Sequence, residues 1–158
     1  MSKLKLLIAV MAVLSFMACN NEKKEDHNGH GKNEPKTQAD SLMADVMDGH
    51  DVGMAKYGKL KAMEKKVKAS MDSISALPAK AKEALAPYKA QLDSASADLN
   101  NAIAAMDKWM EEFNMDSAQD DMEKRVQYLL DEKMKVGKVK EAILNSLGRA
   151  DSLLKAKL

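Results

Sequence analysis

The sequence predicts an all-α protein, namely an antiparallel three-helix bundle with coiled-coil-like packing. From residue 37 onward the apolar residues recur at alternating steps of three and four, and no segment alternates as a half-buried strand would. Only two short breaks interrupt this spacing, one at Pro78 and one at residues 114–117. Because the connections are this short, successive helices must run antiparallel.

The first helix is expected over residues 39–76. Proline is tolerated only in the first turn of a helix, so Pro78 either ends this helix or opens the next one. Glu64 and Lys68 form the outward i,i+4 pair that is typical of a solvated face, although Glu64 also recurs in the inner-face spacing. The residues on the expected inner face are Val46, His50, Gly53, Tyr57, Leu60, Glu64, Val67, Met71 and Ile74.

The second helix has the most regular apolar face in the chain. Pro87 either bends this helix or marks its true start. Its inner face is expected to contain Ala81, Leu85, Tyr88, Leu92, Ala95, Leu99, Ala102, Met106, Trp109 and Phe113.

The third helix follows the break at residues 114–117, with Asp116 as its expected cap and Gln119 three residues further on. Lys133 and Lys140 fall in core register, so this helix either drifts around the bundle or leaves a face open to a partner. Asp131 and Lys135 are expected to pair on its outer side. Its inner face is expected to contain Met122, Val126, Leu129, Val136, Ile143, Leu147, Ala150 and Leu154.

Residues 1–18 have the organisation of a cleaved signal peptide. Lys3 and Lys5 precede an apolar run over residues 6–17 that is too short to span a bilayer. Small Ala18 and the only cysteine, Cys19, end this segment, which resembles a bacterial lipoprotein signal. We therefore expect Cys19 to be acylated and to become the mature N-terminus. The alternative is an ordinary secretory signal with an incidental cysteine.

Residues 19–38 are expected to form a flexible tether between the lipid and the bundle of residues 39–158. Residues 20–38 contain no Leu, Ile, Val, Met or aromatic residue, so they cannot bury enough surface to offset ordering. The charged run after Cys19 resembles that of surface lipoproteins of Bacteroidetes, which favours the outer membrane. His27 and His30 form a His-x-x-His motif, which we interpret as part of a solvated linker.

Charge and motifs narrow the function. The chain carries 25 Lys and Arg against 24 Asp and Glu, so no field of one sign indicates nucleic acid. Gly-rich phosphate loops, Gly-x-Ser-x-Gly elbows and His-Glu-x-x-His pairs do not occur in the sequence. We therefore expect no enzymatic activity, but an envelope-anchored protein-binding or structural module.

A methionine-rich cluster is the strongest candidate for chemistry. Folding about residue 77 places His50 level with residue 105. Seven of the ten methionines that follow residue 18 then gather at one end of the bundle. The residues expected there are Met43, Met47, His50, Met54, Met106, Trp109, Met110, Met115 and Met122.

This cluster has two principal interpretations. Thioether sulfur and imidazole suit Cu(I) or Ag(I), and the candidate metal residues are His50, Met47, Met54, Met106, Met110 and Trp109. The favoured interpretation is that methionine fills the core and His50 is a half-buried core histidine. Haem is a third and weaker interpretation, since residues 39–158 hold one histidine. Gly49, Gly53 and Gly58 either allow close backbone approach or mark a kink.

Two segments carry a family resemblance: His50-Asp51-Val52-Gly53-Met54-Ala55-Lys56-Tyr57-Gly58-Lys59-Leu60 and Trp109-Met110-Glu111-Glu112-Phe113. They resemble the small Bacteroidetes lipoproteins often labelled viral A-type inclusion proteins. The resemblance covers most of the chain after Gln38. It implies a helical envelope lipoprotein and no particular activity.

Overall fold

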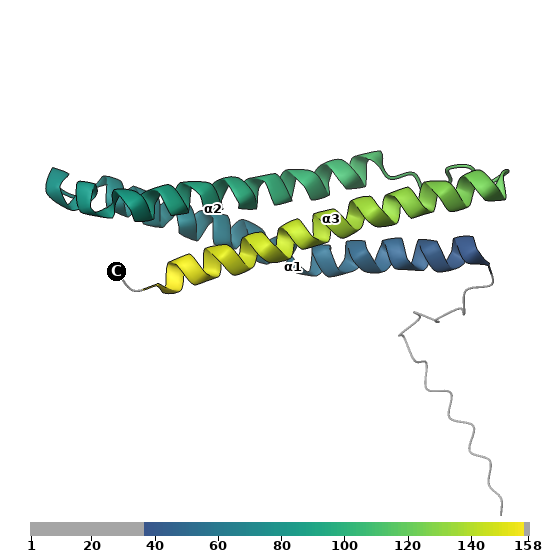
Figure 1. The fold of residues 1–158 in the computed structure, drawn as a ribbon, viewed down its shortest axis with the longest axis horizontal. Coiled ribbons are helices and arrows are strands. Elements are labelled where there is room, and N and C mark those ends of the chain that lie inside the picture. The colour runs from purple at the N-terminus through teal and green to yellow at the C-terminus, as the bar shows by residue number, and fades with distance from the viewer. Residues whose placement is uncertain (1–36, 157–158) are drawn as a thin grey trace, which may run out of the picture. The chain divides into compact units, whose positions relative to one another are not determined.

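The computed structural model describes residues 37–156, which form three helices: α1 (Gln38–Ser75), α2 (Ala79–Glu112) and α3 (Met122–Lys155). Successive helices run antiparallel, and each packs against the other two (Figure 1). The predicted all-α three-helix bundle is therefore confirmed. The expected signal peptide, Cys19 and all but the last two residues of the tether lie outside the described residues.

The start of α1 is set by a capping box. Thr37 Oγ1 accepts a hydrogen bond from the Asp40 backbone N–H at 3.1 Å, and the Asp40 carboxylate accepts one from the Thr37 N–H at 3.0 Å. These bonds satisfy backbone donors that have no partner within the helix. The sequence prediction placed this start within one residue.

The connection between α1 and α2 is formed by three residues, Ala76, Leu77 and Pro78. Pro78 is the N-cap of α2 and holds an extended conformation, so proline opens the second helix. Pro87 lies inside α2 at an exposed position and does not mark its start. No helix in residues 37–156 is both long and apolar enough to cross a membrane.

The connection between α2 and α3 corrects the predicted cap. Asp116 accepts a hydrogen bond from the Gln119 side chain at 2.6 Å, but both residues lie in the turn before the helix. Asp121 is the N-cap, and its carboxylate accepts from the Lys124 N–H at 3.1 Å. The reason is Ala118, whose φ of 56° is left-handed and keeps the chain out of helical geometry until residue 121.

One core runs along the bundle. Its largest fully buried side chains come from all three helices: Val46, Leu60 and Val67 from α1; Leu92, Leu99 and Met106 from α2; Leu129, Val136 and Ile143 from α3. These residues follow the predicted inner faces. Ion pairs join the helices outside the core, including Lys133 with Asp45 at 2.7 Å and Arg149 with Asp98.

Candidate functional site

A row of four aromatic rings crosses the bundle where α1 begins and α2 ends. The His50 ring of α1 lies 5.6 Å, centroid to centroid, from Trp109 of α2. Trp109 stacks on Phe113 at 4.8 Å, and Phe113 stacks on Tyr128 of α3 at 6.3 Å. The sequence predicted that His50 would lie level with residue 105. It instead lies against Trp109, one turn further along α2. Side chains lean toward the N-terminus of their own helix, which displaces contacts between antiparallel helices in this direction.

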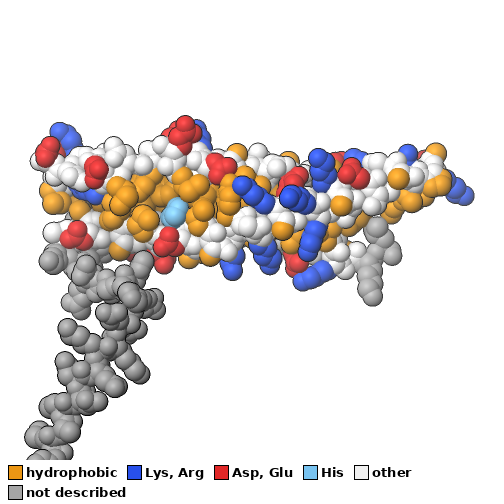
Figure 2. All heavy atoms as spheres, turned by 180° about the vertical axis from the view of Figure 1, so that it is seen from behind, with side chains coloured by type: hydrophobic (Ala, Val, Ile, Leu, Met, Phe, Trp, Pro, Cys, Tyr) orange, Lys and Arg blue, Asp and Glu red, His pale blue; other side chains and the backbone are white. Residues whose placement is uncertain are grey.

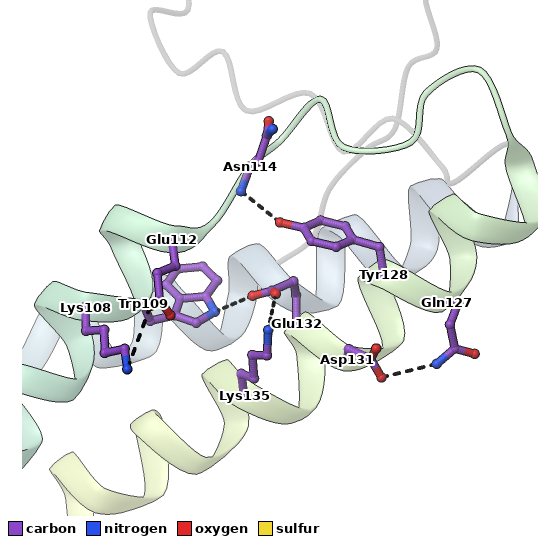
Figure 3. A network of polar contacts seen from close by, with 9 residues as sticks. All are labelled: Lys108, Trp109, Glu112, Asn114, Gln127, Tyr128, Asp131, Glu132 and Lys135. Carbon is purple, nitrogen blue, oxygen red and sulfur yellow. Dashed lines mark hydrogen bonds and ion pairs between the residues drawn. The ribbon is translucent and has the colours of Figure 1, made fainter.

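A buried carboxyl group, that of Glu132, accepts a hydrogen bond from the Trp109 indole. The indole N–H donates to Glu132 Oε2 at 2.9 Å, and Lys135 Nζ donates to Glu132 Oε1 at 2.7 Å (Figure 3). Only 4% of Glu132 is exposed, whereas Lys135 reaches solvent. The hydrogen bond that Lys135 donates to the Glu132 carboxylate raises the pKa of Lys135 above its usual value. A buried carboxyl group that accepts hydrogen bonds on both oxygens fixes the indole ring in one orientation.

This network corrects two predictions for α3. Lys133 was expected in core register, but it is exposed and pairs with Asp45, while Glu132 takes the buried position. Lys135 pairs with Glu132 rather than with Asp131, which accepts from Gln127. Both changes have one cause, since a buried indole N–H needs an acceptor. Lys140, also expected in core register, is half-buried.

Two of the three glycines in α1 allow close helix contacts. A Cβ atom on Gly53 would overlap the terminal methyl of Met106, and one on Gly49 would lie 2.9 Å from Val136 Cγ1. A Cβ on Gly58 would meet nothing within 4 Å. Gly49 and Gly53 therefore let α3 and α2, respectively, approach the α1 backbone, and Gly58 has no such role.

The six predicted metal residues occupy different depths. Met106 is fully buried against Gly53, and Trp109 is 5% exposed with its N–H bonded to Glu132. Met47, His50 and Met54 are half-buried, and Met110 is 38% exposed. His50 Nδ1 lies 2.9 Å from Asp51 Oδ1, so Nε2 is the ring nitrogen left for another contact. The fold thus brings these residues to one end, with two of them underneath the others.

We call the outer layer of this region the methionine surface: Met43, Met47, His50, Met54, Met110 and Phe113. Spacings of four, three and four place its α1 members on one face of the helix. Its α2 members lie opposite, since the Tyr57 hydroxyl donates to Asp107 one turn away. Figure 2 shows the histidine ring surrounded by apolar side chains on the side of the molecule that it displays.

Acidic residues surround the methionine surface. Residues 38–55 contain four aspartates and no Lys or Arg, and residues 107–123 contain seven acids and one lysine, Lys108. Asp40 and Asp51 on α1 and Asp107 and Glu111 on α2 are exposed. Lys61 lies over the Tyr57 ring at 4.4 Å and bounds the surface toward the far end of the bundle.

Across residues 37–156 no three His, Cys, Asp or Glu side chains are grouped so that they could hold a metal ion. Comparison of the chain with protein-family models, with curated proteins and with solved structures finds no match.

Proposed function

We propose that this chain is an envelope-anchored lipoprotein, attached to the outer membrane through Cys19, whose bundle binds another protein. The anchor rests on the order of charge, apolar run and cysteine in residues 1–19. The binding role rests on one observation, the methionine surface. Met110 is 38% exposed and the other apolar side chains of this surface are half-buried, so all of them remain partly accessible above the buried core.

Accessible methionines of this kind favour a protein ligand. Met and aromatic residues are enriched in protein interfaces, and the flexible thioether chain adapts to different partner shapes. Met106, directly beneath, is fully buried, so the bundle needs no further cover there in order to fold. Retaining such groups at the surface is explained by a partner that covers them.

The anchor is tested by fractionation. Cys19→Ala should move the protein from the membrane fraction to the soluble periplasmic fraction, because the lipid is lost. Unchanged fractionation, together with mass spectrometry of an unmodified Cys19 in the original chain, would contradict the lipoprotein assignment.

The binding role is tested by photo-crosslinking in intact envelopes. A benzophenone amino acid replacing Met47 should give a discrete adduct with one protein, whereas the same group replacing Glu83, exposed on α2, should not. Absence of any adduct from position 47, or identical adducts from both positions, would contradict the proposal.

A soft-metal site is the second candidate function, favoured by the half-buried His50 between the half-buried Met47 and Met54. Cu(I) bound there should quench Trp109 fluorescence with a one-to-one endpoint, since the two rings are 5.6 Å apart. His50→Ala with Met54→Leu should remove this effect and leave the helical signal intact. Absence of quenching by Cu(I) and by Ag(I) at neutral pH under reducing conditions would eliminate this candidate.

A further inference from the structure

The methionine surface combines a rigid base with a flexible top. Phe113, a member of the surface, stacks between the rings of Trp109 and Tyr128, and Glu132 accepts a hydrogen bond from the Trp109 indole N–H at 2.9 Å. Above this base the methionine side chains are flexible thioethers; Met43 and Met54 also pack against the core, whereas Met110 is 38% exposed. A ligand with protruding apolar side chains can therefore be accommodated at little cost to the bundle.

The dimensions of the surface fit one short helix. On α1 it runs from Met43 to Met54, which is about 16 Å at 1.5 Å per residue. About three turns of a partner helix span this length, and they would present apolar residues at i, i+3 or i+4, i+7 and i+11.

The negative charges around the surface favour a positively charged partner. Asp40 and Asp51 border it along α1, and Asp107 and Glu111 border it along α2. Exposed charges at the rim of an interface steer association and exclude partners of like charge. A symmetric dimer of this chain would place these acids against one another, so it is disfavoured.

From these three features we infer that the methionine surface binds a cationic amphipathic helix of another protein. This inference rests on the proposed binding function and names the chemistry of its partner. The apolar face of the helix would cover Met47, His50 and Met54, and its Lys or Arg residues would lie over Asp51 and Glu111.

The test measures binding of synthetic helical peptides to the chain secreted with Cys19→Ala, by fluorescence anisotropy of labelled peptide. The probe peptide contains leucine on one face and lysine on the other. One control peptide replaces each lysine with glutamate, and a second has the probe's composition with its leucines dispersed. Only the probe should bind, and rising salt should weaken it because the rim charges are exposed.

Variants of the chain locate the binding. Met47→Gln with Met54→Gln should weaken probe binding at least about tenfold, and Asp51→Lys with Glu111→Lys should do the same while improving binding of the glutamate peptide. The matched controls are Met134→Gln on α3, which is 60% exposed, and charge reversal of two acids at the other end of the bundle, Asp72 and Glu83. Both controls should leave binding unchanged, and circular dichroism should show every variant folded.

Several results would overturn the inference. Equal binding of the lysine and glutamate peptides would show that the acidic residues do not select a cationic partner. An equal loss of probe binding in Met134→Gln would show that the probe does not bind at the methionine surface. Self-association abolished by the Met47 and Met54 changes would assign the surface to a second copy. Failure of the probe peptide to bind, together with a one-to-one endpoint in the Cu(I) titration, would assign the surface to metal binding. Probe failure with the position-47 crosslink intact overturns this inference alone, whereas loss of the crosslink overturns the proposed function.

Discussion

Gly53→Ala gives the sharpest test of how α1 and α2 meet beneath the methionine surface. The new Cβ would overlap the Met106 terminal methyl and would lie 3.4 Å from Ile143 Cδ1. Alanine in a helix interior is more stable than glycine by about 1 kcal/mol, while an extra methyl in a packed core costs about 1–3 kcal/mol. The net effect on the free energy of unfolding is therefore a change between zero and a loss of about 2 kcal/mol.

Gly58→Ala is the matched control on the same helix. Gly58 is exposed, and a Cβ there meets nothing within 4 Å, so only the helix-propensity gain remains. We expect this variant to be more stable than the original chain by about 1 kcal/mol. The two variants should then differ by about 1–3 kcal/mol, which is the overpacking cost alone.

Urea unfolding followed by circular dichroism measures both values. Met106→Leu, which lacks the terminal methyl, should reduce the cost of Gly53→Ala, giving a coupling energy of about 1 kcal/mol or more in a double-mutant cycle. Equal stabilisation by Gly53→Ala and Gly58→Ala would show that Met106 does not rest on Gly53, and the geometry of this end of the bundle would be refuted.

Three further predictions address the core and the α2–α3 connection. Leu92→Ala and Leu99→Ala should each lower the free energy of unfolding by about 2–5 kcal/mol, because both side chains are fully buried. Losses below about 0.5 kcal/mol in urea titrations would contradict the placement of these residues on the inner face of α2. Ala118→Gly should raise the melting temperature, because φ of 56° strains a residue with a Cβ; a decrease would argue against that conformation. Hydrogen bonds from Lys124 lower the pKa of Asp121 in the folded chain. The ionised Asp121 therefore adds to the free energy of unfolding above the unfolded pKa of 3.8, and this contribution is lost as the pH falls through the lower folded pKa. The stability advantage of the original chain over Asp121→Asn should therefore shrink on acidification from about pH 7 to about pH 3, and a constant difference in thermal unfolding would contradict it.

Local sequence was sufficient for the helices themselves. Apolar spacing, Thr37 with Asp40, and Pro78 are properties of neighbouring residues, and they set where α1 and α2 begin and which faces turn inward. Short connections then forced antiparallel order. The prediction of Asp116 as the α3 cap was wrong. Ala118 has a left-handed backbone conformation, which alanine rarely adopts and which the sequence therefore does not predict.

Only the tertiary structure decided which neighbour on a helix is buried and what it contacts. Glu132 and Lys133 are adjacent, and helical periodicity places both near the edge of the core face. Glu132 is buried because Trp109, 23 residues earlier on another helix, presents an N–H that requires an acceptor. The sequence by itself determined that methionines, His50 and Trp109 gather at one end. Packing depth decided that Met106 and Trp109 lie beneath and that Met47, Met54 and Met110 reach the surface, because depth depends on the partner helix and not on spacing along one chain.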